Sequence, residues 1–137
     1  MITGERSLAR QTKYCNAIKS TLTDKGHATN NELLVELRKS FAELSATTVH
    51  RATARLASRG EVGLAPATKD GSMRYDANIK PHDHFLCNNC DMLRDTDVKH
   101  KITPILESSI IDCQISGRLT ISGTCKNCIK LTRKDYL

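Results

Sequence analysis

Aromatic residues are scarce in this sequence. It contains no tryptophan, two phenylalanines and three tyrosines, so any hydrophobic core must be mainly aliphatic. Long apolar runs are lacking as well, because no segment reaches the roughly 20 residues that a membrane-spanning helix needs. The segment Met1–Arg6 has none of the apolar character of a secretory signal peptide. These absences argue against a membrane or secreted protein, and we expect a soluble, cytoplasmic one.

Acidic residues are outnumbered by basic ones. The sequence has 21 lysines and arginines against 15 aspartates and glutamates, which gives a net charge of +6. This positive charge favours an acidic partner, and nucleic acid is the first candidate, although many basic proteins bind no nucleic acid. The length of 137 residues allows one domain or two small ones. Small domains of this size often need a metal ion to be stable.

Four of the six cysteines have the spacing of a zinc site. Cys87 and Cys90 form one C-x-x-C pair, and Cys125 and Cys128 form a second. Four thiolates from two such pairs can bind one Zn(II) tetrahedrally. Cysteines in metal spacing fit a reducing compartment better than a disulfide framework. The sequence therefore predicts a structural zinc site.

Potential ligands of a second kind flank the first cysteine pair. His82 and His84 alternate with other residues, so on a strand both imidazoles point to one face. Asp95 follows the pair closely. Imidazoles and carboxylates without a thiolate suit Fe(II), Mn(II) or Zn(II). We expect a more open metal site next to the closed one.

The N-terminal half predicts three helices followed by a β-hairpin. The first helix should run from Ser7 to about Lys25, and the capping box Thr29–Glu32 should begin the second. The third should run from the N-cap Ser45 to Arg59, and a hairpin should turn at Lys69–Gly71. This order of elements is that of a winged helix-turn-helix. The positions expected in its core include Leu8, Ile18, Leu22, Leu33, Leu37, Val49 and Leu56.

The third predicted helix carries the strongest sign of nucleic-acid binding. Residues 44–60 contain no aspartate or glutamate. Arginines at every fourth position form one basic stripe, and polar side chains occupy the first two turns, where a recognition helix reaches base edges. A solvated surface could carry such arginines too, but the lack of acidic residues favours DNA. The candidate DNA-binding residues are Thr47, Thr48, His50, Arg51, Arg55 and Arg59, the last two at phosphates.

A boundary near residues 77–81 divides the chain and makes the fold class α+β. We expect a winged-helix DNA-binding domain over residues 1–78 and a metal-binding domain over residues 79–137. The second domain predicts strands around the first cysteine pair, a helix, two strands divided at Gly117, and a frayed tail after Cys128. Thr103 and Pro104 are expected at the cap and first position of the main part of that helix. Its buried side should consist of Ile102, Ile105, Leu106 and Ile110.

Three segments together resemble the ferric-uptake-regulator (Fur) family of bacterial metal- and peroxide-responsive repressors. These are Thr48–Arg51, His82–Cys90 and Gly123–Cys128. The resemblance covers nearly the whole chain. It implies an N-terminal winged helix-turn-helix domain and a C-terminal α/β dimerisation domain with a four-cysteine zinc site. It also implies a homodimer that binds a double-stranded DNA operator under the control of a regulatory metal.

The resemblance implies the ligands of that regulatory Fe(II) or Mn(II). The matching positions are His27, Asp76, His82, His84 and Asp95. Members that sense peroxide carry aspartate at the position of Asp95, whereas iron-uptake regulators more often carry glutamate. We therefore predict a repressor of the peroxide-sensing PerR type, in which Fe(II) and peroxide oxidise His27 or His82 and DNA is released.

Several alternatives remain open. The chain could be an iron-, manganese- or zinc-uptake repressor without peroxide sensing, or a metal-free or zinc-only DNA-binding module. A non-haem iron enzyme is less favoured because no substrate-specific groups accompany the ligands, so we expect no enzyme. The family usually has tyrosine in place of His50, which leaves the operator sequence open. Cys15 and Cys113 lack C-x-x-C partners and are expected to be buried small residues, with a redox role for Cys113 less favoured.

Overall fold

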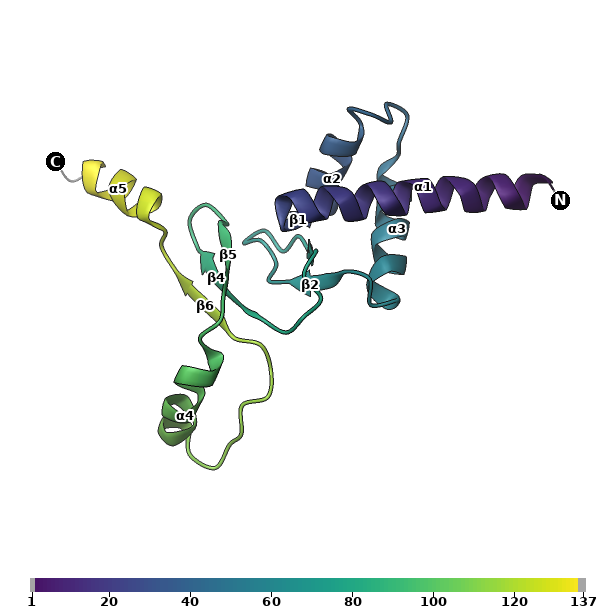
Figure 1. The fold of residues 1–137 in the computed structure, drawn as a ribbon. Helices are drawn as coiled ribbons and strands as arrows, with labels where there is room; N and C mark the ends of the chain where they lie inside the picture. Colours follow the sequence, from purple (N-terminus) through teal and green to yellow (C-terminus); the bar gives the residue numbers. More distant parts are fainter. Residues whose placement is uncertain (1, 136–137) are drawn as a thin grey trace. The chain divides into compact units, whose positions relative to one another are not determined.

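The computed structural model describes the backbone of residues 2–135 and the side chains of residues 12–132. The chain divides into two compact units, Met1–Ile79 and Lys80–Leu137 (Figure 1). Among the residues described, no helix combines the length and apolar character that crossing a bilayer requires. The fold mixes helices and sheets, as the sequence predicts for the α+β class.

The first unit contains three helices and a three-stranded antiparallel sheet. Its elements are α1 (Ile2–Lys25), β1 (His27–Thr29), α2 (Asn30–Leu37), α3 (Ala46–Ser58), β2 (Gly63–Ala65) and β3 (Arg74–Asp76). The strand order is β1-β3-β2, so the central strand pairs with both others. The predicted β2–β3 hairpin is present, and β1 is an additional strand whose His27 pairs with Asp76.

Side-chain caps determine where α2 and α3 begin. The Thr29 hydroxyl accepts the backbone N–H of Glu32, and the Glu32 carboxylate accepts that of Thr29, so the predicted capping box is confirmed. Ser45 caps α3 by accepting the N–H of Thr48 at 3.2 Å. Gly26, with φ of +82°, ends α1 and turns the chain into β1. Helix α1 begins before the predicted Ser7, at Ile2.

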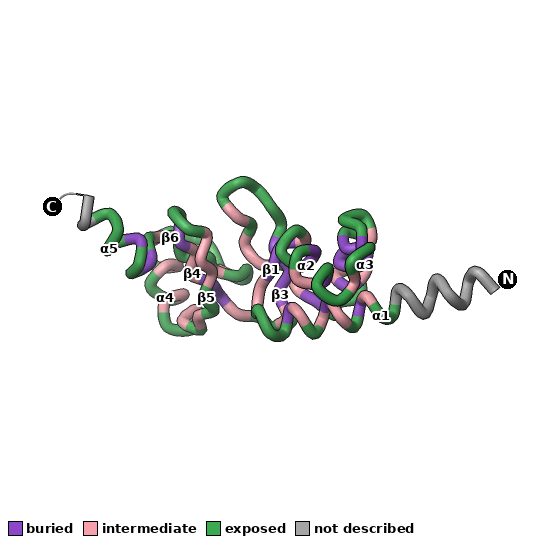
Figure 2. Tube along the Cα trace, turned by 90° about the horizontal axis from the view of Figure 1, so that it is seen from above, coloured by how far each residue is buried: buried purple, intermediate pink, exposed green. Residues whose placement is uncertain are grey.

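Aliphatic side chains from all three helices form the core of the first unit. Ile18, Leu22, Leu33 and Val49 are fully buried, and Tyr75 joins them from the sheet. Figure 2 shows these buried stretches along α2, α3, β1 and β3. Burying a side chain of this size contributes about 1.5–3 kcal/mol. The predicted inward positions are confirmed, except that the Leu8 side chain lies outside the residues described.

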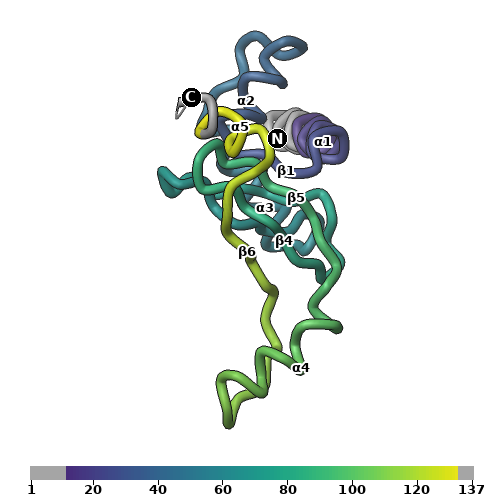
Figure 3. Tube along the Cα trace, turned by 90° about the vertical axis from the view of Figure 1, so that its left-hand side faces the viewer, coloured from purple at the N-terminus to yellow at the C-terminus, as the bar shows by residue number. Residues whose placement is uncertain are grey.

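The second unit is a three-stranded sheet with two helices. Its elements are β4 (Asp83–Cys87), β5 (Leu93–Thr96), α4 (Lys99–Ile110), β6 (Thr120–Gly123) and α5 (Lys126–Asp135). Strand β4 is central, with β5 antiparallel to it and β6 parallel. Figure 3 shows the three strands side by side, with α4 beyond one end of the sheet. The parallel pairing brings the two cysteine pairs together although 34 residues separate Cys90 from Cys125 in sequence.

Helix α4 differs from the prediction in two respects. None of its residues, all of which are described, is buried, and Ile105 and Ile110 are 69% and 60% exposed. A helical period identifies an apolar side, but it does not supply a surface to cover that side. Pro104 lies inside the helix, and Thr103 is not a cap, because the helix already begins at Lys99, four residues before Thr103. The proline removes one backbone hydrogen bond there.

The C-terminal segment differs from the prediction as well. Only β6 is a strand, and Ile115 lies in a loop where its N–H donates to the Glu107 carboxylate at 2.8 Å. The tail after Cys128 is expected to be frayed, but its described residues, up to Asp135, continue α5; residues 136–137 lie outside the described part. The Ile129 N–H donates to the Cys125 carbonyl at 2.9 Å, so this helix grows directly out of the second cysteine pair. Cys15 is buried as predicted, whereas Cys113 is exposed.

Candidate metal centres and nucleic-acid interface

The four predicted zinc ligands converge in the second unit. The Sγ atoms of Cys87 and Cys128 lie 3.8 Å apart, and those of Cys90 and Cys125 lie 3.7 Å apart. All four are free thiols, and their sulfur atoms lie within 4.8 Å of one another. Zinc–sulfur bonds of about 2.3 Å in a tetrahedron place the sulfurs about 3.8 Å apart. The cluster therefore suits a structural zinc.

Backbone hydrogen bonds shape this cluster. After the first pair the chain turns at Asp91, whose φ is +65° and whose N–H donates to the Cys87 carbonyl. The Asn88 N–H donates to the Gly123 carbonyl at 2.8 Å and thereby ties β4 to β6. Gly123 also packs closely on Phe85, since an added Cβ would lie 3.2 Å from its ring. The geometry of the cluster thus depends on the β4–β6 pairing.

The thiols of the cluster differ in acidity. The backbone N–H of Cys125 lies 3.3 Å from Cys87 Sγ, and this bond, followed by the backbone N–H of Cys90, lowers the pKa of Cys87 to about 6. A side-chain hydrogen bond with Cys125, followed by burial, raises the pKa of Cys128 to about 12. The protein alone therefore favours one thiolate and disfavours another. A cation is needed to hold all four deprotonated together.

A second group of ligands lies in the same unit, around the start of β4. The Nε2 atoms of His82 and His84 lie 3.5 and 3.4 Å from Asp95 Oδ1. The two ring centroids are 4.5 Å apart, so the imidazoles lie next to each other, although His82 precedes strand β4, which begins at Asp83. His84 is 1% exposed and Asp95 is 49% exposed. The site is buried on the histidine side and open on the carboxylate side.

Hydrogen bonding prepares His82 to act as a ligand. Its Nδ1 lies 2.6 Å from the Lys80 carbonyl oxygen, so Nδ1 carries the proton and Nε2 keeps its lone pair. This lone pair faces Asp95 rather than solvent. Bonds of about 2.1 Å to a divalent ion place neighbouring ligand atoms about 3.0–3.4 Å apart. The spacing of the two imidazoles and the carboxylate fits such an ion.

The first unit contributes a separate pair, His27 and Asp76. They are direct partners across β1 and β3, and His27 Nε2 lies 3.6 Å from Asp76 Oδ2. Asp76 is 1% exposed, and its other oxygen accepts the Asn78 N–H at 2.9 Å. A carboxylate this buried needs a positive or hydrogen-bonding partner. The structure thus joins His27 to Asp76, and His82 and His84 to Asp95, in two different units.

The six predicted DNA-binding residues all lie on or next to α3. Thr47, His50, Arg51 and Arg59 are exposed, whereas Thr48 and Arg55 are half-buried. Arg59 is the C-cap residue of the helix. The Thr48 hydroxyl lies 2.9 Å from that of Ser45, so it takes part in the cap as well as in the surface.

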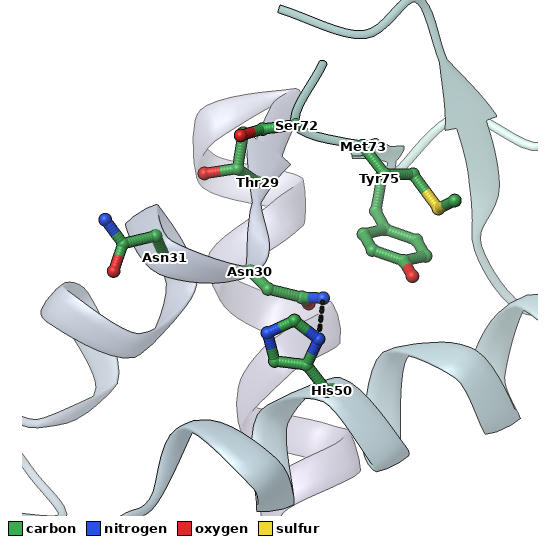
Figure 4. Close-up of a pocket in the computed structure, with 7 residues that line it drawn as sticks. All are labelled: Thr29, Asn30, Asn31, His50, Ser72, Met73 and Tyr75. Atoms are coloured by element: carbon green, nitrogen blue, oxygen red, sulfur yellow. Dashed lines mark hydrogen bonds between the residues drawn. The ribbon is translucent and has the colours of Figure 1, made fainter. Parts of the chain in front are cut away.

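One residue next to these side chains of α3 was not predicted from the sequence. It is Asn30, at the start of α2. Its side chain contacts His50 and closes one side of a cavity of about 350 Å³. Thr29, Asn31, Ser72, Met73 and Tyr75 line the rest (Figure 4). The sequence gives no signal for this contact, because Asn30 and His50 lie 20 residues apart and Asn30 resembles part of a helix cap.

One family of sequences and several solved structures are similar to this chain. A sequence model described as "Ferric uptake regulator family" matches residues 8–112. The Campylobacter jejuni peroxide stress regulator is 21% identical with a TM-score of 0.71, and the comparison covers 92% of this chain and 96% of that one. The ferric uptake regulator Fur of Helicobacter pylori is 18% identical with a TM-score of 0.69, over 93% and 91% of the two chains.

A third solved structure, the Francisella tularensis ferric uptake regulator with iron, is 20% identical with a TM-score of 0.65, over 85% of this chain and 91% of that one. At these identities the solved structures establish a common fold. No curated protein matches the sequence.

Proposed function

Because this chain belongs to the ferric uptake regulator family, we propose that it is a metal-dependent DNA-binding repressor that senses peroxide through Fe(II)-dependent oxidation of a histidine. The supporting observation is the separation of two metal-site chemistries. One group of ligands is four thiolates, and the other ligands are imidazoles and carboxylates without a thiolate. The first suits permanent Zn(II), and the second suits Fe(II) or Mn(II).

We assign DNA binding to the first unit, as a winged helix-turn-helix. Helix α3 is the recognition helix and the β2–β3 hairpin is the wing. The six residues of α3 named above contact the operator, with Thr47 and His50 nearest the bases and the arginines nearest the phosphates. The face is basic because residues 44–60 contain no acidic residue.

The protein acts as a cytoplasmic homodimer through its second unit. Ile105, Ile110 and Ile111 are each at least 60% exposed on α4 and just after it. Such a cluster of exposed isoleucines is costly in water, and a second copy of the same surface would cover it. A homodimer presents two recognition helices, which suits two half-sites on double-stranded DNA.

The regulatory ion would be held by His27 and Asp76 from the first unit and by His82, His84 and Asp95 from the second. Because its ligands come from both units, binding restricts how the units are arranged. Metal then favours DNA binding only to the extent that the ion prefers the arrangement in which both recognition helices match their half-sites.

Peroxide sensing rests on the imidazoles. Fe(II), when bound, would activate peroxide next to these rings, and the two electrons that reduce the peroxide would come overall from the oxidised imidazole. In the net reaction one peroxide oxygen is bonded to Cε1 of His27 or His82, the other leaves as water, and the ring hydrogen moves to nitrogen. The 2-oxo ring then carries a proton on both nitrogens and has no lone pair left for a metal. Losing one ligand of five weakens the site, and DNA is released.

The test is a DNA shift assay with Mn(II) and with Fe(II), each with and without peroxide, on DNA selected from a random pool by the Mn(II)-loaded protein. We expect both metals to promote binding and peroxide to abolish only the Fe(II) complex. Mass spectrometry should find one added oxygen on peptides holding His27 or His82. Unmodified peptides from a treated Fe(II) protein would overturn peroxide sensing.

The same panel decides on the alternative of a metal-uptake repressor, which would bind DNA with metal and ignore peroxide. Asp95 should separate the two, because its short side chain reaches both His82 and His84. An Asp95→Glu variant should keep metal-dependent DNA binding and lose most of its peroxide response. A fully sensitive variant would show that Asp95 does not determine the signal.

A further inference from the structure

His50 lies on the second turn of α3, and among the described residues one side chain, that of Asn30, forms a hydrogen bond with its ring. The Nδ1 atom of His50 lies 3.3 Å from Nδ2 of Asn30, on the neighbouring helix α2. The ring otherwise borders the 350 Å³ cavity, with Asn30 on one side of it (Figure 4). An exposed ring beside a cavity has little packing to fix its orientation. The hydrogen bond to Asn30 is therefore what orients it.

The orientation of the Asn30 amide is itself fixed by a hydrogen bond from Thr53. The Thr53 hydroxyl, fully buried in α3, donates to Asn30 Oδ1 at 2.8 Å. The carbonyl oxygens of Val49 and His50 also lie within reach of this hydroxyl, at the longer distances of 3.1 and 3.2 Å. With its oxygen accepting from Thr53, the amide must turn its nitrogen towards His50. The relay runs from Thr53 through Asn30 to His50.

This relay selects one tautomer of the imidazole. Because Nδ1 accepts from Asn30, the proton of the neutral ring must sit on Nε2. No other side chain among residues 12–132 forms a hydrogen bond with the His50 ring. The Nε2–H group is therefore a donor directed away from Asn30, on an exposed residue of α3.

We propose that Asn30 is a positioning residue for sequence recognition, and that it holds His50 so that Nε2–H donates to a base acceptor in the major groove. Purine N7, guanine O6 and thymine O4 are such acceptors, whereas cytosine presents an N4 donor there. The protein should therefore discriminate against cytosine at one position of each half-site. This inference rests on the proposed DNA-binding function.

A double-mutant cycle tests whether Asn30 acts through His50. The Mn(II)-loaded full-length protein first selects its operator from random DNA, and binding is then measured to operators with each base at each position. His50→Ala should reduce discrimination at one base pair per half-site by about three- to tenfold, as expected for one hydrogen bond. Asn30→Ala should reduce discrimination at the same base pair, and the double variant should match His50→Ala.

Asn31→Ala is the matched control, because Asn31 is the neighbouring asparagine and lines the same cavity without contacting His50. It should leave the discrimination unchanged. Replacing the purine at the position in question by its 7-deaza analogue should weaken binding of the unmodified protein and not of His50→Ala, if N7 is the acceptor. Equal effects on both proteins would exclude that acceptor.

Two results would overturn the proposal. Asn30→Ala could leave base discrimination intact, in which case Asn30 has no part in it. It could instead weaken binding to all sequences equally, also in the His50→Ala background, in which case Asn30 contacts the DNA backbone itself.

The tautomer can be measured without DNA. In ¹⁵N spectra of histidine-labelled protein, His50 should show a protonated Nε2 and an unprotonated Nδ1. Asn30→Ala and Thr53→Val should each give a mixture of tautomers, whereas Asn31→Ala should not. A protein that selects no operator would refute the proposed function and base reading together, and the ring spectra would still decide the positioning. An Nδ1-protonated ring in the unmodified protein would refute the relay.

Discussion

Each unit of this chain contains a three-stranded sheet, but different interactions stabilise the interior of each unit. In the first unit the buried cluster consists of aliphatic side chains from three helices, with Tyr75 from the sheet. In the second unit the buried cluster among the described residues is Cys87, Cys125 and Cys128, with only Phe85 and Met92 packed against it. A core of three thiols cannot supply the free energy that a folded unit needs. We therefore expect the first unit to fold on its apolar core and the second to need a metal ion in order to fold.

Removing zinc should have the largest effect, and only on the second unit. Cys128→Ser should lose zinc and with it about 10 kcal/mol or more of folding free energy. Hydrogen exchange should then rise throughout β4–β6 and α5, while α1–α3 stay protected. Cys113→Ser, at an exposed cysteine, is the control and should behave like the unmodified protein. Equal loss of protection in α1–α3 would show that the apolar core is not sufficient.

A cavity in the apolar core of the first unit should destabilise that unit and leave the second unit unchanged. Leu33 is fully buried, so Leu33→Ala should lower the free energy of unfolding of the first unit by about 2–5 kcal/mol. Denaturant titration should detect the shift, and the zinc content should remain one ion per chain. Loss of zinc from this variant would mean that the two units fold as one.

Substituting an exposed apolar residue should weaken dimerisation in the second unit but not in the first. Ile105→Ser should weaken the dimer by roughly a hundred- to ten-thousandfold, because the dimer loses two isoleucines, one from each chain, and each contributes about 1.5–3 kcal/mol when buried. Sedimentation at a series of concentrations measures this directly. Val35 in the first unit is exposed to a similar degree, 62% against 69%, and Val35→Ser should leave the dimer intact. If both variants dimerise normally, α4 is not the dimer surface.

The smallest effect concerns a helix cap. Thr29→Ala removes the acceptor for the Glu32 N–H and should cost the first unit about 1 kcal/mol. Thr47→Ala, at an exposed threonine of α3, is the comparison and should leave thermal stability unchanged. The zinc-dependent transition of the second unit should be the same in both variants.

Local chemistry made part of this architecture predictable from the sequence. The capping box at Thr29, the N-cap Ser45 and the turn around Gly71 act over a few residues, and each predicted an element that the structure contains. The C-x-x-C spacing likewise predicted the convergence of four thiols, because sulfur ligands at this spacing have one common use.

Other features depend on contacts that no local pattern records. Strand β1 has only three residues, too few for a period, and exists because β3 lies beside it. The apolar side of α4 follows a helical period correctly, yet nothing in the described part of the chain buries it. The contact of Asn30 with His50 joins two helices and requires the packing of the whole first unit.

Strand β4 has a consequence for the order in which the protein is assembled. It carries His84, and three residues later it ends at Cys87 inside the thiol cluster. A strand that is ordered only after zinc arrives cannot present His84 to Asp95 beforehand. In a cell short of zinc, the newly made chains would thus lack the ordered His84–Asp95 site that binds iron or manganese. A newly made chain would therefore bind its regulatory metal only after it had bound zinc.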